Sequence, residues 1–157
     1  MLTLTTSSAK ETFHLGEILG RLLEPGDVIC LQGELGAGKT CFVQGIARGQ
    51  GVEDYVSSPS FTLINVYQGR LPFYHIDVYR LTDVAETDQL GLEEYLEDDG
   101  VVCLEWADRI QPILPPACLW VVMGKRGPTE RSLRFEPHGA RYRQLVADFK
   151  AAVEGRD

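Results

Sequence analysis

Basic residues are scarce in this sequence of 157 amino acids: Lys and Arg number 15 against 23 Asp and Glu, which gives a net charge of -8. A protein that binds nucleic acid by itself neutralises phosphates with lysine and arginine. The charge balance therefore argues against direct binding to nucleic acid. We expect any work on RNA to pass through a partner protein.

Long apolar runs are absent as well. No stretch approaches the roughly 20 apolar residues that a membrane-spanning helix needs, and residues 1–5 lack the basic and apolar regions of a secretory signal. We therefore expect a cytoplasmic protein with no membrane association. The four cysteines include no Cys-x-x-Cys pair, so the sequence gives no indication of structural zinc or dithiol redox chemistry.

The most informative stretch is residues 33–40, GELGAGKT, which fits the pattern G-x-x-x-x-G-K-[ST]. Residues 27–31 before it predict a buried strand, and residues 41–48 after it predict a helix. Glycines let backbone amides approach phosphates closely, and a helix N-terminus adds unpaired donors and a positive dipole end. The sequence therefore predicts a phosphate-binding loop, in which Lys39 reaches the β- and γ-phosphates and the Thr40 hydroxyl binds Mg²⁺.

The hydrophobic pattern predicts the other elements, and the length fits one domain spanning residues 1–157. Strands alternate with helices, and some neighbouring strands can pair antiparallel. This predicts a three-layer α/β fold, a P-loop NTPase-like domain with a mixed central sheet flanked by helices. The predicted strands are 2–5, 61–67, 73–79, 101–104, 119–123 and 132–135; the predicted helices are 8–23, with a capping box at its start, one or two short helices within 83–99, and 142–153.

Acidic residues near the ends of apolar strands are candidates for the chemistry, because ligands of open α/β sheets gather at the carboxyl ends of strands. Glu105 directly follows the apolar run 101–104, and we assign it to Mg²⁺, directly or through water. Asp77 shares one face of its strand with His75, and we assign it to the attacking water. A structural pair between Asp77 and a histidine or arginine is the alternative.

Three further features have two interpretations each. Ser58 and Ser60 lie in a loop that can fold over the γ-phosphate, or form a plain turn. Trp106 can stack on or shield the nucleotide site, or serve packing. Residues 83–99 hold eight acidic residues and no basic one, which indicates a solvated face or a docking surface for a basic partner.

Four stretches, in this order, resemble the TsaE family, also called YjeE. They are GELGAGKT at 33–40, SSPSFTL at 57–63, HIDVYRL at 75–81 and LEWADR at 104–109. The resemblance implies an ATPase required for threonylcarbamoyl modification of adenosine 37 in tRNA. It implies that the protein binds the partner proteins TsaB and TsaD, meets tRNA only through that complex, and does not itself transfer the threonylcarbamoyl group.

The same resemblance implies a set of site residues. It implies Mg²⁺ on Thr40 and Glu105, and a further nucleotide contact around Ser8 or Ala9. Ser60 stands where the family usually has threonine, and Glu34 replaces a common aspartate; neither change removes a required chemical group. The implied ATP contacts along the loop are Leu35, Gly36, Ala37, Gly38, Lys39 and Thr40.

Other classes of P-loop protein stay open. Residues 88–91 match the Asp-x-x-Gly element of regulatory GTPases. However, no apolar strand precedes this stretch, and the sequence has no Asn-Lys-x-Asp motif to recognise guanine. A third class is a binding module that is controlled by nucleotide and hydrolyses it negligibly. This class is hard to separate from an ATPase that depends on a partner, because the sequence offers no convincing internal arginine finger. A small-molecule or nucleotide kinase needs an acceptor pocket and usually an arginine-rich lid. Two interpretations fit the basic residues Lys125, Arg126, Arg131 and Arg134: such a lid, or the more common exposed hairpin tip.

Overall fold

The structure, a computed structural model, describes residues 1–34, 36–54, 56, 64–78 and 91–155, with Arg109 described by its backbone only. Within these residues, seven strands form one mixed sheet in the order β1-β7-β6-β2-β5-β4-β3. The strands are β1 (Leu2–Thr6), β2 (Val28–Gly33), β3 (Ile64–Gln68), β4 (Pro72–Asp77), β5 (Val101–Glu105), β6 (Cys118–Lys125) and β7 (Arg131–His138). The helices are α1 (Ala9–Leu22), α2 (Lys39–Gly49), α4 (Leu92–Glu97), α5 (Ala140–Glu154) and the 3₁₀ helix η1 (Ala107–Ile113).

Pairing in the sheet is parallel at its centre and antiparallel toward both edges. Strand β2 pairs parallel with β5 and with β6, and β5 pairs parallel with β4. The β3–β4 hairpin and the β6–β7 and β7–β1 pairs are antiparallel. The mixed sheet that the sequence predicts, with some neighbouring strands paired antiparallel, is thus confirmed.

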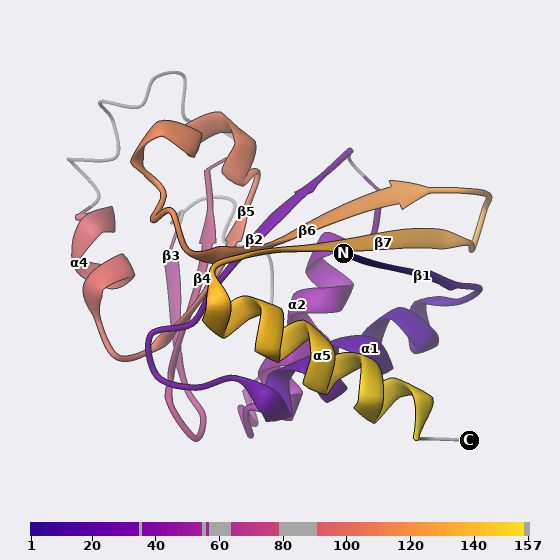
Figure 1. Cartoon of the computed structure of the whole chain (residues 1–157), viewed down its shortest axis with the longest axis horizontal. Helices are drawn as coiled ribbons and strands as arrows, with labels where there is room; N and C mark the ends of the chain where they lie inside the picture. The colour runs from indigo at the N-terminus through magenta and orange to yellow at the C-terminus, as the bar shows by residue number, and fades with distance from the viewer. Residues whose placement is uncertain (35, 55, 57–63, 79–90, 156–157) are drawn as a thin grey trace.

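Helices cover the two faces of the sheet unequally (Figure 1). Helices α1, α2 and α5 pack on one face, against side chains that include Phe73, Val101 and Cys103. Helix α4 and η1 pack on the other face, against Val102 and Leu104 among others. Strand β5 is therefore buried on both faces, which explains its uninterrupted apolar run. No helix in the described part of the chain has the length and apolar character needed to cross a membrane.

Several predicted boundaries shift in the structure. Helix α2 begins at Lys39, two residues before the predicted start, because Gly38 in the left-handed region forms its N-cap. Strand β4 ends at Asp77, two residues before its predicted end at Tyr79. Tyr79 itself lies outside the described residues. The 3₁₀ helix was not predicted, since residues 107–113 form only a short segment and contain Pro112.

The start of α1 follows its predicted cap only in part. The Ser8 hydroxyl accepts a hydrogen bond from the Glu11 N–H at 3.2 Å. The Glu11 carboxylate accepts from the N–H and the hydroxyl of Ser7, at 3.2 and 2.5 Å, and not from the Ser8 N–H of a regular capping box. The predicted start of the helix is thus right, but the Glu11 side chain bonds to Ser7 and not to the N-cap residue Ser8.

Four glycines bring α1 and α2 into close contact: Gly16, Gly20, Gly45 and Gly49. A methyl group at Gly45 would lie 2.1 Å from the Phe13 carbonyl oxygen, and one at Gly20 would lie 2.2 Å from the Ile46 carbonyl oxygen. The contact also aligns the first turns of both helices, where the Cys41 thiol donates to the Ala9 carbonyl at 3.3 Å. Helix α1 therefore begins beside the glycine loop.

We predict that Gly45→Ala destabilises the fold although alanine is the better helix former. Helix propensity alone would stabilise the protein by up to about 1 kcal/mol. The methyl group instead meets the backbone of α1, and overpacking of this kind costs about 1–3 kcal/mol. Urea unfolding measures the difference, with Ala151→Gly on the exposed face of α5 calibrating the propensity effect. A more stable Gly45→Ala protein would contradict the close helix contact.

Candidate functional site

The glycine loop connects β2 to α2 at the carboxyl end of the parallel strands. Gly36 and Gly38 have φ angles of 82° and 94°, which side-chain-bearing residues rarely adopt. At Gly33 a methyl group would lie 2.5 Å from the Met123 carbonyl oxygen. The predicted contact Leu35 lies outside the described residues. Glycine is thus required at three positions of the loop, for its turn geometry and for its packing on β6.

A cavity of about 300 Å³ opens against this loop. It is lined by Gly36, Ala37, Gly38, Lys39, Thr40, Cys41, Asp77, Glu105 and Trp106. The structure therefore brings the loop together with both predicted carboxylates and with the predicted tryptophan. Ser58 and Ser60, also predicted to lie over the nucleotide, fall outside the described residues.

Lys39 lies at the centre of this arrangement and is 5% exposed. Its ammonium donates to the carbonyl of Gly33, and to that of Glu34 at 3.0 Å. Burial lowers the pKa of Lys39, and the nearby carboxylates of Glu105 and Asp77 oppose this shift. The ammonium is thus desolvated and has negative charge close by.

The Trp106 ring covers the same ammonium, with the Lys39 Nζ 3.9 Å from its centroid. Trp106 has a φ of 63° and is the only non-glycine residue with positive φ in the described part of the chain. For a bulky side chain this conformation costs about 1–2 kcal/mol. The strained turn between β5 and η1 thus accompanies the placement of the ring beside the loop.

The two predicted carboxylates end adjacent parallel strands. Asp77 of β4 pairs in register with Glu105 of β5, and the two residues are 7% and 3% exposed. His75 lies two residues before Asp77 and its Nε2 is 2.5 Å from Glu105 Oε2. The sequence predicted that His75 and Asp77 share a face, but not that His75 binds Glu105. A contact across strands leaves no signal in the spacing along one strand.

The oxygen atoms around the cavity fit a magnesium ion. The Thr40 hydroxyl and the carboxylates of Asp77 and Glu105 line one space, and Mg²⁺ prefers oxygen ligands. Among the described residues no group of three His, Cys, Asp or Glu side chains could enclose a metal. Such a sparse set suits an ion that takes its other ligands from phosphates and water.

A smaller cavity of about 140 Å³ adjoins the first through Gly38 and Cys41. Ala9, a predicted nucleotide contact, lines it together with Thr12, Pro128, Thr129 and Arg131. Ser8 is not among these lining residues and caps α1 instead. The sequence did not predict Thr129 or Arg131 as nucleotide contacts, because their turn is distant from the loop along the chain.

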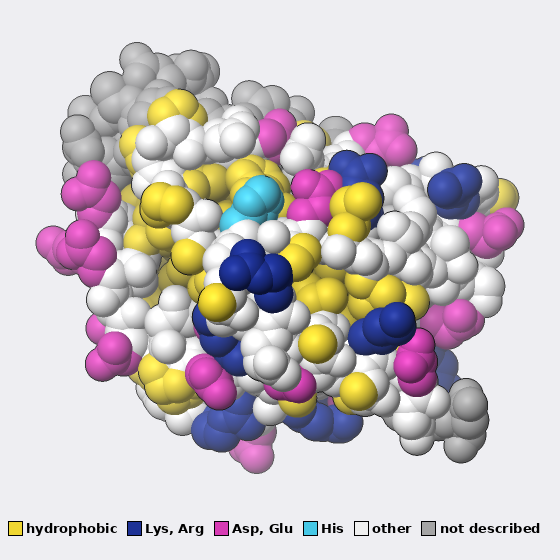
Figure 2. Space-filling model, in the orientation of Figure 1, with side chains coloured by type: hydrophobic (Ala, Val, Ile, Leu, Met, Phe, Trp, Pro, Cys, Tyr) yellow, Lys and Arg dark blue, Asp and Glu magenta, His cyan; other side chains and the backbone are white. Residues whose placement is uncertain are grey.

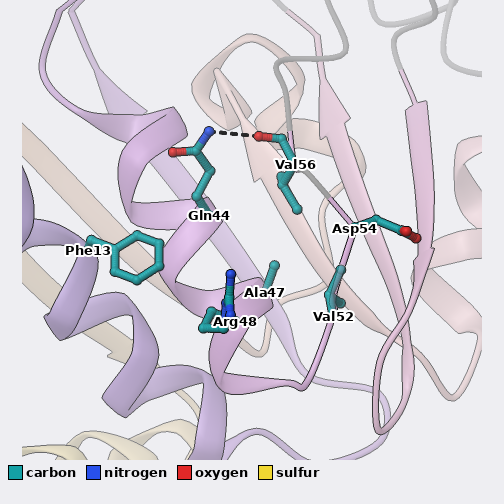
Figure 3. A pocket seen from close by; sticks show the side chains of 7 residues that line it. All are labelled: Phe13, Gln44, Ala47, Arg48, Val52, Asp54 and Val56. Carbon is teal, nitrogen blue, oxygen red and sulfur yellow. Dashed lines mark hydrogen bonds between the residues drawn. The ribbon is translucent and has the colours of Figure 1, made fainter.

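A third hollow, of about 150 Å³, lies between α1, α2 and the segment that follows α2 (Figure 3). Gln44, one helical turn after Thr40, donates to the Val56 carbonyl at 2.7 Å. This bond ties α2 to the chain just before residues 57–63. The hollow contains none of the predicted site residues.

The strand, glycine loop and helix, with acidic residues on neighbouring parallel strands, define a P-loop NTPase-like protein. A family model described as "Threonylcarbamoyl adenosine biosynthesis protein TsaE" matches residues 6–133. The chain therefore belongs to the TsaE family of threonylcarbamoyladenosine biosynthesis proteins. The match extends past residue 109, where the four stretches that carry the resemblance end.

Individual relatives agree with this assignment. The chain is 43% identical over 144 residues to the tRNA threonylcarbamoyladenosine biosynthesis protein TsaE of Bacillus subtilis, covering 91% of this chain and 90% of that protein. The TsaE protein of Treponema pallidum is 48% identical over 108 residues, or 69% of this chain and 80% of its own. A solved structure, "Crystal structure of Bacillus subtilus YdiB", superposes with a TM-score of 0.85 at 38% identity, covering 96% of this chain and 94% of that one. The predicted fold class is confirmed.

We predict that Glu105→Gln lowers the Lys39 pKa further, and by more than Asp77→Asn does. Both carboxylates raise this pKa against the effect of burial, and Glu105 has the larger influence. Carbon-13 NMR titration of labelled lysine measures the shift. The chain has four lysines, and the Lys39 resonance is the one missing from Lys39→Arg. An unchanged or higher Lys39 pKa in Glu105→Gln would contradict the arrangement.

Proposed function

We propose that this protein is a Mg²⁺-dependent ATPase that supports threonylcarbamoyl modification of adenosine 37 in tRNA. It acts by nucleotide-dependent binding to a TsaB–TsaD transferase complex, and it does not transfer the threonylcarbamoyl group. The observation that carries the proposal is the cavity shared by the glycine loop, Thr40, Asp77 and Glu105. Family membership supports the pathway, and the cavity supports the chemistry.

In this proposal the loop amides and the first turn of α2 bind the β- and γ-phosphates. Lys39 exchanges its bonds to the Gly33 and Glu34 carbonyls for phosphate oxygens, which are stronger acceptors because they are charged. Thr40 and Glu105 would hold Mg²⁺, which would supply positive charge beside these phosphates. Asp77 orients the water that attacks the γ-phosphorus; the bond from phosphorus to the bridging oxygen breaks, ADP leaves with that oxygen, and the water oxygen leaves in inorganic phosphate, its protons passing to phosphate and solvent.

The smaller cavity at Ala9 supports a place for the rest of the nucleotide. It shares Gly38 and Cys41 with the phosphate cavity as lining residues. The Arg131 guanidinium donates to the Gly127 and Glu130 carbonyls at 3.1 and 2.9 Å, which fixes it at the wall of this cavity. We assign the ribose and base to this space.

The kinase alternative receives little support from the same arginines. Arg131 is engaged with its own turn, and Arg134 pairs with Glu136 at 2.5 Å. Arg134 also lines a separate hollow with Trp120, on the side of the sheet away from α1. The Asp-x-x-Gly stretch of the GTPase alternative lies outside the described residues except for Gly91.

Two features support dependence on a partner. Among the described residues, Lys39 is the only basic side chain that lines the phosphate cavity, so a second cation for the transition state would come from elsewhere. The described part of the acidic run exposes carboxylates over α4 and just after it (Figure 2). They are Glu93, Glu94, Glu97, Asp98 and Asp99. We assign this surface to contact with a basic region of the partner complex.

Lys39→Ala is expected to lose ATP binding while the protein stays folded. The substitution removes the basic side chain that the described residues bring to the cavity, and the sheet and α2 retain their apolar packing. Calorimetry with ATP and Mg²⁺ measures binding, and circular dichroism checks the fold. Arg48→Ala, on the exposed side of the same helix, is the matched loss of charge and should bind normally. Wild-type affinity in Lys39→Ala would reject the assigned role.

Turnover of ATP and GTP, with and without purified TsaB and TsaD, tests the function itself. We expect slow ATP hydrolysis by the protein alone and clear stimulation by the two partners, because Lys39 is the only basic side chain that the described residues bring to the cavity. Release of phosphate is the measurement, with Lys39→Ala as the inactive control. A strong preference for GTP would favour the switch class, and phosphate transfer to a small acceptor would favour a kinase.

A further inference from the structure

His75 of β4 is a fully buried polar residue next to the site, with 0% exposure. Its Nε2 lies 2.5 Å from Oε2 of Glu105. Glu105 lines the phosphate cavity, whereas His75 is not among the residues that line it. A ligand in the cavity would therefore meet the carboxylate and not the imidazole.

The hydrogen bonding of His75 is one-sided. A carboxylate is an acceptor, so Nε2 carries the proton that is donated to Glu105. The other ring nitrogen, Nδ1, is buried and has no hydrogen-bond partner among the described residues. A buried polar atom without a partner costs stability. An apolar residue at this position would avoid that cost, but it would remove the hydrogen bond to Glu105. The bond to the carboxylate is therefore the contact that accounts for the histidine.

Glu105 has a competing partner in the same space. The Lys39 ammonium lies close enough for the Glu105 carboxylate to raise its pKa. A carboxylate that is free to rotate has no fixed orientation toward a metal on Thr40. The hydrogen bond from His75 holds one carboxylate oxygen and so restricts that rotation.

We propose that His75 is the positioning residue of Glu105: its Nε2–H binds Oε2 and leaves the other carboxylate oxygen available to Mg²⁺. The inference rests on the proposed function, because it takes Glu105 as the metal carboxylate. It assigns no direct contact between His75 and nucleotide or metal.

The test compares nucleotide binding with and without the metal. Calorimetry with the non-hydrolysable analogue AMP-PNP is carried out over a range of Mg²⁺ concentrations and in EDTA. Loss of a residue that orients a metal ligand typically weakens metal affinity by roughly 10- to 100-fold. His75→Leu should raise the Mg²⁺ concentration needed for half-maximal binding by that factor, while affinity in EDTA stays close to wild type.

Two variants separate positioning from a merely structural role. His75→Gln retains an N–H donor of similar reach and should recover most of the wild-type Mg²⁺ dependence; it also serves if His75→Leu does not fold. Tyr74→Phe removes a hydrogen bond to Asp98 on the opposite face of the same strand and should leave the Mg²⁺ dependence unchanged. In a Glu105→Gln background, His75→Leu should have no further effect on the Mg²⁺ dependence.

The outcomes distinguish this inference from the proposed function. If Glu105→Gln shifts the Mg²⁺ requirement but His75→Leu does not, the metal site stands and the positioning role is wrong. If His75→Leu weakens binding equally with Mg²⁺ and in EDTA, its role is structural only. If Glu105→Gln leaves the Mg²⁺ requirement at the wild-type value, the assigned metal carboxylate is wrong and the inference falls with it.

Discussion

The parallel pairing of β2, β5 and β4 is the constraint on which the site depends. This pairing puts Leu31, Glu105 and Asp77 in register across three strands. Parallel strands end at the same edge of a sheet, so the glycine loop after β2 opens beside the two carboxylates. A shift of one residue between β4 and β5 would turn Asp77 toward the opposite face. Burial of β5 on both faces resists such a shift.

The helices bring further groups to the site at the edge of the sheet. The glycine contact between α1 and α2 brings the start of α1 to the start of the phosphate-loop helix, and the smaller cavity with Ala9 forms there. Lys39, desolvated beneath Trp106 and bonded to loop carbonyls, is the point at which loop, helix and β5 turn meet. The three elements therefore bring their groups to one space although they are distant in sequence.

The sequence was sufficient for features that depend on local pattern. The residue pattern of the loop predicted the strand–loop–helix unit. The hydrophobic pattern, including the apolar run of β5, predicted the mixed sheet, and the alternation along β4 predicted the face of Asp77. Features that depend on tertiary contact could not be predicted. The bond from His75 to Glu105 needs the β4–β5 register, Arg131 reaches the cavity through a distant turn, and the backbone of Trp106 has a conformation that its residue type disfavours.

We propose that one magnesium ion lies between the first turn of α2 and the end of β5, beside nucleotide phosphates bound to the loop. A crystal structure of the protein with Mg²⁺ and a non-hydrolysable ATP analogue would locate the ion and the phosphates. We expect the β- and γ-phosphates on the amides of residues 36–40, with the ion between the Thr40 hydroxyl and the Glu105 carboxylate. Phosphates bound elsewhere, or an ion remote from both side chains, would contradict it.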